Sequence, residues 1–180
     1  VKDGLLERRR GAGTFVCEGT NAVDLLSLGG TIASFRESGI DLKTRLTRKL
    51  KLRRVRGDPQ NPFDGREAYT ATRLGHIDGD AVVLEAFHFS PTLFPAMDTL
   101  FAGEPFSEFI RRQYRLRPLG GQQAFSVTTA DDALARTLHQ DDPPLLEVRR
   151  TLDFPGEDAA VYVIIYCNTR NHIFTQQLGT

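Results

Sequence analysis

Two segments of the sequence repeat one pattern, and this repetition constrains the fold more than any other feature. Each segment is a β-prone run, a short acidic turn that contains glycine, and a second β-prone run. The first extends from Tyr69 to Phe89 around His-Ile-Asp-Gly-Asp, and the second from Leu145 to Cys167 around Pro-Gly-Glu-Asp. Such segments are typical of antiparallel hairpins. Strands joined by hairpins rather than by strand–helix–strand crossovers predict an antiparallel sheet.

Amphipathic segments between the two hairpins predict helices that pack on this sheet. Residues 107–116 carry Phe109 and further apolar residues at helical spacing, and we expect Ser107 to be the N-cap. Residues 129–140 also have a leucine stripe, and we expect Thr129 to cap this second helix. The resulting fold class is α+β, an antiparallel sheet flanked by helices.

The segments before the first hairpin predict a short helix, a basic strand and a loop. Residues 31–39 have helical spacing and end at Gly39, whereas residues 57–68 are rich in proline and glycine. Residues 43–56 alternate as a strand does, with a basic outer face. The expected inner face consists of Thr44, Leu46, Arg48, Leu50, Leu52 and Arg54. The basic face is either a sheet edge protected by its charges or a contact surface for nucleic acid or an anionic effector.

The first residues of the chain predict a separate hairpin with a basic tip. Its strands are expected at residues 5–9 and 14–17, joined by three arginines and two glycines. Because an isolated hairpin is only marginally stable in water, we expect it to belong to a larger unit. Residues 18–31 are small and polar with a short apolar patch, and we interpret them as a linker.

Length, charge and cysteine content exclude several classes of protein. The 180 residues suffice for one ordinary domain, and the sequence contains neither a long apolar span nor a signal-peptide pattern. We therefore expect a cytoplasmic protein without a membrane partner. The two cysteines are far apart and neither lies in a Cys-x-x-Cys pair, so no zinc site, disulfide framework or redox motif is expected. We also expect no metal site elsewhere and no cofactor. The net charge is zero, but residues 1–56 hold 13 Lys and Arg against 6 Asp and Glu, which hints at a polyanionic partner.

The order of the motifs resembles one family along almost the whole chain. GLLERRRGAGTFV is similar to the wing of the winged helix-turn-helix in GntR-type bacterial transcription regulators. The remainder resembles the UTRA effector-binding domain of that family's HutC branch, on the motifs SFRESG, TRLGHIDGD, VVLEAFHF, PFSEFI, TTADDALARTL, PLLEVRRTLDF and IIYCNTRNHIF.

The resemblance implies a domain organisation and a set of partners. Residues 1–17 would be the end of a winged helix-turn-helix whose recognition helix precedes Val1, residues 18–31 a linker, and residues 32–180 a UTRA domain with a chorismate-lyase-like fold. The implied partners are operator DNA, a small-molecule effector and a second copy of the chain.

The resemblance also implies two groups of functional residues. The effector-binding candidates are Arg73, Glu85, Ser107, Phe109, Ser34 and His88. The candidates for DNA contact at the wing are Arg8, Arg9, Arg10, Gly11, Gly13 and Thr14. Physical chemistry supports the first group in part, because an arginine fork binds a carboxylate or phosphate through two hydrogen bonds. The simpler alternatives are that Ser107 is only an N-cap and that Arg73 is a structural ion-pair partner of Glu85 or Asp78.

The sequence departs from the sugar-phosphate-sensing members of this family at three positions. Gly75 replaces a second arginine, and Val161 and Cys167 replace a glutamate and a tyrosine of the last hairpin. Each change removes a polar group that would hold sugar hydroxyls or a dianion. Among anionic effectors, which include organic carboxylates and phosphates, a small or apolar carboxylate is therefore favoured over a phosphosugar.

Three functions remain as hypotheses at this point. The first is an allosteric transcription regulator in which the effector changes dimer geometry and hence operator affinity. The second is a chorismate-lyase-like enzyme acting on an aromatic carboxylate, for which Glu85 is the obvious acid or base. The third is a nucleic-acid-binding protein that acts through residues 43–56.

Overall fold

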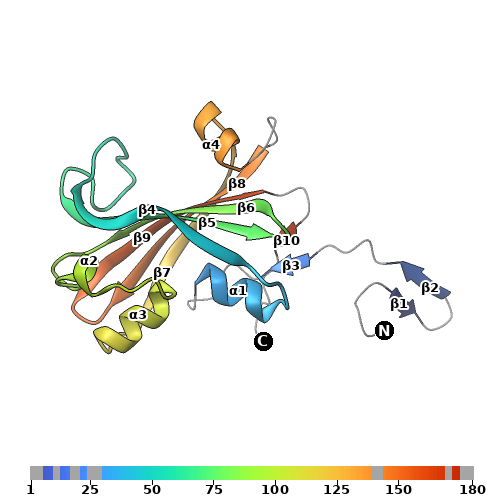
Figure 1. The fold of residues 1–180 in the computed structure, drawn as a ribbon, viewed down its shortest axis with the longest axis horizontal. Coiled ribbons are helices and arrows are strands. Elements are labelled where there is room, and N and C mark those ends of the chain that lie inside the picture. Colours follow the sequence, from blue (N-terminus) through green and yellow to red (C-terminus); the bar gives the residue numbers. More distant parts are fainter. Residues whose placement is uncertain are drawn as a thin grey trace.

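The main body of the protein is one antiparallel sheet of six strands (Figure 1). It is seen in a computed structural model that describes residues 6–9, 13–16, 21–23, 30–138, 144–168 and 172–174. The strands lie in the order β4-β5-β6-β9-β8-β7. Their bounds are β4 Lys43–Arg54, β5 Glu67–Ile77, β6 Asp80–Phe89, β7 Gly120–Thr129, β8 Pro144–Phe154 and β9 Glu157–Asn168. The predicted antiparallel sheet with flanking helices is confirmed.

Both predicted hairpins are present, and they form the centre of the sheet. In the first, Asp78 and Gly79 both have positive φ, 52° and 96°, as a two-residue type I′ turn between β5 and β6 requires. In the second, β8 and β9 are joined at Pro155 and Gly156. The hairpins meet where β6 pairs with β9.

Helices lie on both sides of this sheet. Figure 1 shows α1 (Thr31–Glu37) and α3 (Phe106–Gln113) on one side and α4 (Asp132–Thr137) on the other. A further short helix, α2 (Met97–Leu100), lies in the proline-rich connection after β6. The largest apolar cluster joins α1 and α3 to the facing side of the sheet. Two smaller clusters occupy the opposite face. No helix in the described part of the chain is long and apolar enough to cross a membrane.

Helix α1 ends as the sequence predicts. The Gly39 N–H donates to the Arg36 carbonyl and the Ile40 N–H to the Phe35 carbonyl, at 3.0 and 2.9 Å. With Gly39 at φ 76°, this pair of bonds is a Schellman motif.

The predicted caps of the other two helices are wrong. Helix α3 begins at Phe106, one residue before Ser107, with Pro105 at the N-cap and no side-chain cap. Ser107 is the second residue of the helix and so does not occupy the capping position. In α4 the cap is Asp131, whose carboxylate accepts the Leu134 N–H at 2.8 Å. Thr129 cannot take this role because it is the last residue of β7, paired with Pro144.

Strands β4 and β7 form the two edges of the sheet, and the sequence predicted them unequally. Strand β4 was expected and occupies an edge, but only part of its predicted inner face is covered. Leu50 is buried whereas Leu52 is 41% exposed, because two irregularities in the pairing with β5 interrupt the alternation. Strand β7 was not predicted. Most of its residues are exposed on both faces, so its sequence has no alternation to read.

The N-terminal segments contain the predicted hairpin and one unexpected strand. Strands β1 (Leu6–Arg9) and β2 (Gly13–Val16) pair antiparallel, with Leu6 opposite Val16. Within the segment interpreted as a linker, β3 (Asn21–Val23) pairs in parallel with β10 (His172–Phe174). Of the candidate DNA contacts, Arg10 and Gly11 lie outside the described residues.

Candidate functional site

A cavity of about 580 Å³ lies between one face of the sheet and helices α1 and α3. Its size is in the range of pockets that hold small molecules. The sheet side of its lining comes from four strands, with alternate residues pointing inward: Arg73 from β5; Glu85, Phe87 and Phe89 from β6; Arg150, Leu152 and Phe154 from β8; Val161, Val163 and Ile165 from β9.

A buried ion pair forms part of the cavity wall. Arg73 and Glu85 face each other across the β5–β6 pair. The Arg73 Nε donates to Glu85 Oε2 at 2.7 Å, and a second guanidinium nitrogen lies 2.6 Å from the same oxygen. The two side chains are only 9% and 1% exposed. The guanidinium carbon also lies 4.8 Å from the Phe87 ring centre, a distance at which cation–π attraction contributes.

A second buried arginine, Arg150, lines the same cavity. It comes from β8, is 3% exposed, and donates through Nε to Gln123 Oε1 of β7 at 3.0 Å. The pKa of the fully buried Cys167 thiol is influenced by both Glu85 and Arg150. Burial raises the pKa of its thiol above the ordinary value, Glu85 raises that pKa further, and Arg150 opposes the rise. Two buried arginines and one buried glutamate therefore line a mostly apolar chamber.

The remaining walls are aromatic and aliphatic. The Phe106 ring of α3 packs on Phe87 and Phe89 of β6, with ring centres 4.7 and 4.9 Å apart. Val161, Val163 and Ile165 of β9 add a continuous aliphatic strip. These walls suit an apolar or flat ligand body, since the gain from burying it is proportional to the apolar area removed from water.

Polar side chains and backbone of α1 and α3 border the cavity. Thr31 of α1, together with Ser107 and Arg111 of α3, is among the lining residues. Across the two helices, Arg36 pairs with Glu108 at 3.6 Å, with both side chains at least half exposed. Altogether the lining contains four arginines, Arg73, Arg111, Arg117 and Arg150, and two glutamates, Glu85 and Glu108. The chamber thus has an excess of positive charge.

The structure brings together three of the six predicted effector-binding residues. Arg73, Glu85 and Ser107 line the cavity. Phe109 is completely buried in the core beneath α3. Ser34 is also completely buried, and its hydroxyl donates to the Gly30 carbonyl at 3.4 Å within its own helix.

His88 lies on the opposite face of the sheet from the cavity. It alternates with Phe87 and Phe89, so its ring points away from them and lies 5.7 Å from the ring of Tyr162. Its Nδ1 is buried without a hydrogen-bond partner. Burial lowers the pKa of His88, although the Tyr162 backbone and the charge of Asp58 oppose this shift.

Sequence analysis did not single out Arg150. Arg149 and Arg150 are neighbours in the sequence, and residue type alone does not show which of them faces the cavity. The only available signal is alternation, because Arg150 shares its parity with Leu152 and Phe154, which also line the cavity. Arg149 points to the other face.

The structure gives a steric reason for glycine at position 75, one of the three positions singled out in the sequence. A side chain at position 75 would begin 2.6 Å from Val83 Cγ1 and 2.9 Å from Leu42 Cδ1, so Leu42 occupies the space that a second arginine would need. Val161 forms part of the aliphatic wall. Cys167 is fully buried.

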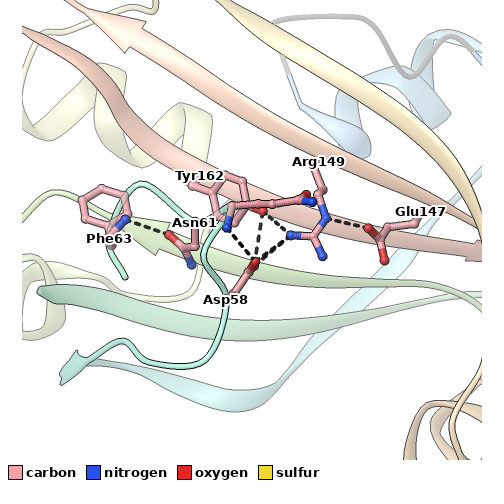
Figure 2. A network of polar contacts seen from close by, with 7 residues as sticks. Asp58, Asn61, Phe63, Glu147, Arg149 and Tyr162 are labelled. Atoms are coloured by element: carbon pink, nitrogen blue, oxygen red, sulfur yellow. Dashed lines mark hydrogen bonds and ion pairs between the residues drawn. The ribbon is translucent and has the colours of Figure 1, made fainter. Parts of the chain in front are cut away.

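A second polar cluster lies on the opposite face of the sheet (Figure 2). Here Arg149 holds the loop after β4 by donating to both oxygens of Asp58, at 3.0 and 2.8 Å. It also donates to the Tyr162 hydroxyl at 2.8 Å and to Glu147 at 2.6 Å. Burial by itself lowers the pKa of Arg149, but these hydrogen bonds outweigh it and raise the pKa. The two carboxylates therefore share one arginine, and this network connects the loop after β4 to strands β8 and β9.

The described residues contain no group of three or more His, Cys, Asp or Glu side chains positioned to hold a metal ion. The polar side chains that line the cavity carry guanidinium, carboxylate and hydroxyl groups and lie against an apolar wall. Such a site can bind and orient an anion through charge-assisted hydrogen bonds.

Comparisons with known proteins identify a domain family and a sequence relative. The model of the UTRA domain matches residues 63–172. A sequence relative, the uncharacterized HTH-type transcriptional regulator YurK of Bacillus subtilis, is 22% identical over 96% of this chain and 73% of its own length.

Two solved structures have the same fold. PhnF from Mycobacterium smegmatis superimposes with a TM-score of 0.76, 18% identity and coverage of 99% of this chain and 80% of PhnF. The effector domain of PhnF from the same organism superimposes with a TM-score of 0.74 and 16% identity, covering 88% of this chain and 99% of that domain.

Proposed function

Since the chain belongs to the UTRA domain family, we propose that it is the ligand-sensing part of a GntR-type transcription regulator of the HutC branch. The observation that carries the proposal is the cavity between the sheet and helices α1 and α3, in which buried arginines meet an apolar chamber. A transcription regulator is also what the name of the relative YurK describes.

The proposed ligand is a small organic carboxylate with an apolar body. The carboxylate would be bound by Arg150, with the Arg73–Glu85 pair and Ser107 beside it. The apolar body would lie against the phenylalanines of β6 and the aliphatic strip of β9. A phosphosugar fits less well, because Gly75, Val161 and Cys167 provide no polar groups for its hydroxyls or its second charge.

The proposed mechanism is allosteric and needs no chemical step. Ligand binding would favour one geometry of a homodimer, and the spacing of the two DNA-reading heads would follow. Only a ligand that binds one geometry more tightly than the other can shift this equilibrium. At the operator, Arg8, Arg9 and Arg10 of the wing, with Gly11, Gly13 and Thr14, would contact the phosphate backbone.

We propose binding without turnover in preference to a lyase reaction. Glu85 is the only candidate acid or base that sequence analysis offered, and one of its oxygens already accepts two charge-assisted contacts from Arg73. An assay of chorismate turnover with the purified chain is expected to detect no product. Product formation would contradict this part of the proposal.

A thermal-shift screen tests the proposed ligand class. Aromatic and aliphatic monocarboxylates are compared with their uncharged amides and with sugar phosphates. A ligand present at 100 times its dissociation constant stabilises the folded state by about 2.7 kcal/mol. We expect stabilisation by carboxylates and not by the matched amides. Equal stabilisation by acid and amide would show that the arginines do not select the ligand.

A further inference from the structure

Two arginines at the rim of the cavity have no part in the proposed carboxylate contact. Arg111 lies on α3, and Arg117 follows in the segment between α3 and β7. These two residues, the rim arginines, belong to the cavity lining but are exposed, whereas Arg73 and Arg150 are buried. The cavity therefore has cationic side chains both on its sheet wall and at its rim.

The charges of the rim arginines are not balanced by neighbouring carboxylates. Of the two glutamates in the lining, Glu85 pairs with Arg73. The other, Glu108, pairs with Arg36 of α1 at 3.6 Å. Among the residues that the structure describes, no ion pair or side-chain hydrogen bond involves either rim arginine. The rim thus offers positive charge that an anionic group of a ligand can neutralise.

The rim arginines and Arg150 are far enough apart to bind two different groups of one ligand. The Leu119 N–H donates to the Asp153 carbonyl at 2.8 Å, so the segment before β7, which carries one rim arginine, lies beside the end of β8. Arg150 precedes Asp153 by three residues, which corresponds to about 10 Å at the rise of a β-strand. The lining over this stretch of β8 is apolar, with Leu152 and Phe154. An apolar wall therefore separates the buried arginine from the rim.

We propose that the ligand is a dicarboxylate whose first carboxylate binds at Arg150 and whose second binds at the rim arginines. The inference rests on the proposed function and deepens it, because it adds a second anionic group and an apolar spacer of matching length. Guanidinium groups bind carboxylates through charge-assisted hydrogen bonds, and the spacer gains free energy by leaving water. Since the rim is exposed, water and salt weaken the second contact. The second carboxylate therefore contributes selectivity rather than most of the affinity.

Calorimetric titration of the 180-residue chain tests the second contact. The titrants are straight-chain dicarboxylates from succinate to sebacate, each compared with its monomethyl ester, which keeps the carbon chain and removes one charge. Two equivalent ends give a dicarboxylate an advantage of about twofold by counting alone. We expect the best dicarboxylate to bind at least about fivefold more tightly than its ester, because exposed ion pairs add a modest gain. This preference should shrink at high salt. Succinate is too short to reach from Arg150 to the rim and should lack it.

The double variant Arg111→Gln/Arg117→Gln removes the rim charges and leaves Arg150 in place. It is expected to bind the monoester about as the wild type does and to retain only about a twofold preference for the dicarboxylate. The matched control is Arg115→Gln/Arg136→Gln, which removes the same charge at two exposed arginines outside the cavity lining. This control should keep the wild-type preference.

The possible failures of the second contact and of the carboxylate site give different results. A wild-type chain that binds each dicarboxylate and its ester within about twofold of each other would overturn the second contact and leave the carboxylate site in place. A preference that persists in the rim variant, or that is equally large for succinate, would also overturn the second contact. If the folded wild type binds neither dicarboxylates nor monocarboxylates, the proposed function itself is wrong.

Discussion

Arg73 and Glu85 form an ion pair in which both side chains are almost fully buried. Each charge therefore depends on the other for its compensation. Removing one partner of such a pair leaves an uncompensated buried charge, which costs about 3–5 kcal/mol. We expect Arg73→Ala to lower the free energy of unfolding by this amount, as measured by urea denaturation. A loss below about 1 kcal/mol would mean that Glu85 is stabilised by other groups.

The double variant Arg73→Met/Glu85→Leu removes the two charges but keeps a similar side-chain volume. Replacing a whole buried pair with apolar residues of similar volume is often neutral or stabilising. The double variant is therefore expected to regain most of the stability lost in Arg73→Ala. Because Arg73→Ala is expected to lower the stability of the fold, ligand binding is better tested at Arg150. Its replacement leaves the Arg73–Glu85 pair in place.

His88 makes stability depend on pH on the acid side. Burial lowers its pKa in the folded protein below the ordinary 6.5, with the Tyr162 backbone and Asp58 opposing. Below pH 6.5 the unfolded chain then binds the proton more readily than the folded one, so stability falls as the pH falls. We expect a His88→Gln variant to lose less stability than the wild type between pH 7.5 and 5, as followed by urea denaturation. Parallel curves for the two proteins would contradict this.

At the scale of single elements, the start of α4 offers a direct test of the capping assignment. Asp131 accepts the Leu134 N–H at 2.8 Å, and replacing such a cap with alanine costs about 0.5–2 kcal/mol. We therefore expect Asp131→Ala to be clearly less stable than the wild type. Thr129→Ala is the matched control two residues away. A larger loss of unfolding free energy in Thr129→Ala than in Asp131→Ala would instead support Thr129 as the N-cap, as expected from the sequence.

Elements marked by turn residues or by alternating apolar residues could be predicted from the sequence. Features that depend on pairing with neighbouring strands could not. The two central hairpins and the end of α1 at Gly39 follow from turn residues and alternation. Strand β7 has no such signal, because both of its faces are exposed. Arg150 was missed for a related reason. It differs from Arg149 only in the face to which the register of β8 assigns it, and register is decided by pairing rather than by residue type.

Over the whole molecule, most lysines and arginines of residues 1–56 fall in two segments, the expected wing at residues 8–10 and edge strand β4. We propose operator contact for the wing, whose arginines would contact phosphates and contribute little sequence reading. The 180-residue chain is therefore expected to bind DNA weakly or not at all at physiological salt. A tight and sequence-specific gel shift with this chain would instead favour recognition through residues 43–56.

Calorimetric titration shows whether Arg150 and the apolar chamber beside it bind a small carboxylate. The titrant is the most stabilising carboxylate of the thermal-shift screen, and the proteins are the wild type, Arg150→Gln and Arg149→Gln. The two arginines are neighbours in sequence on opposite faces of one strand, so each variant is the control for the other.

A hydrogen bond to a charged group is worth about 1.5–3 kcal/mol. We therefore expect Arg150→Gln to weaken carboxylate binding at least about tenfold, and Arg149→Gln, although less stable, to bind almost as the wild type does. Equal affinity of Arg150→Gln and wild type, or loss of binding only in Arg149→Gln, would contradict this expectation.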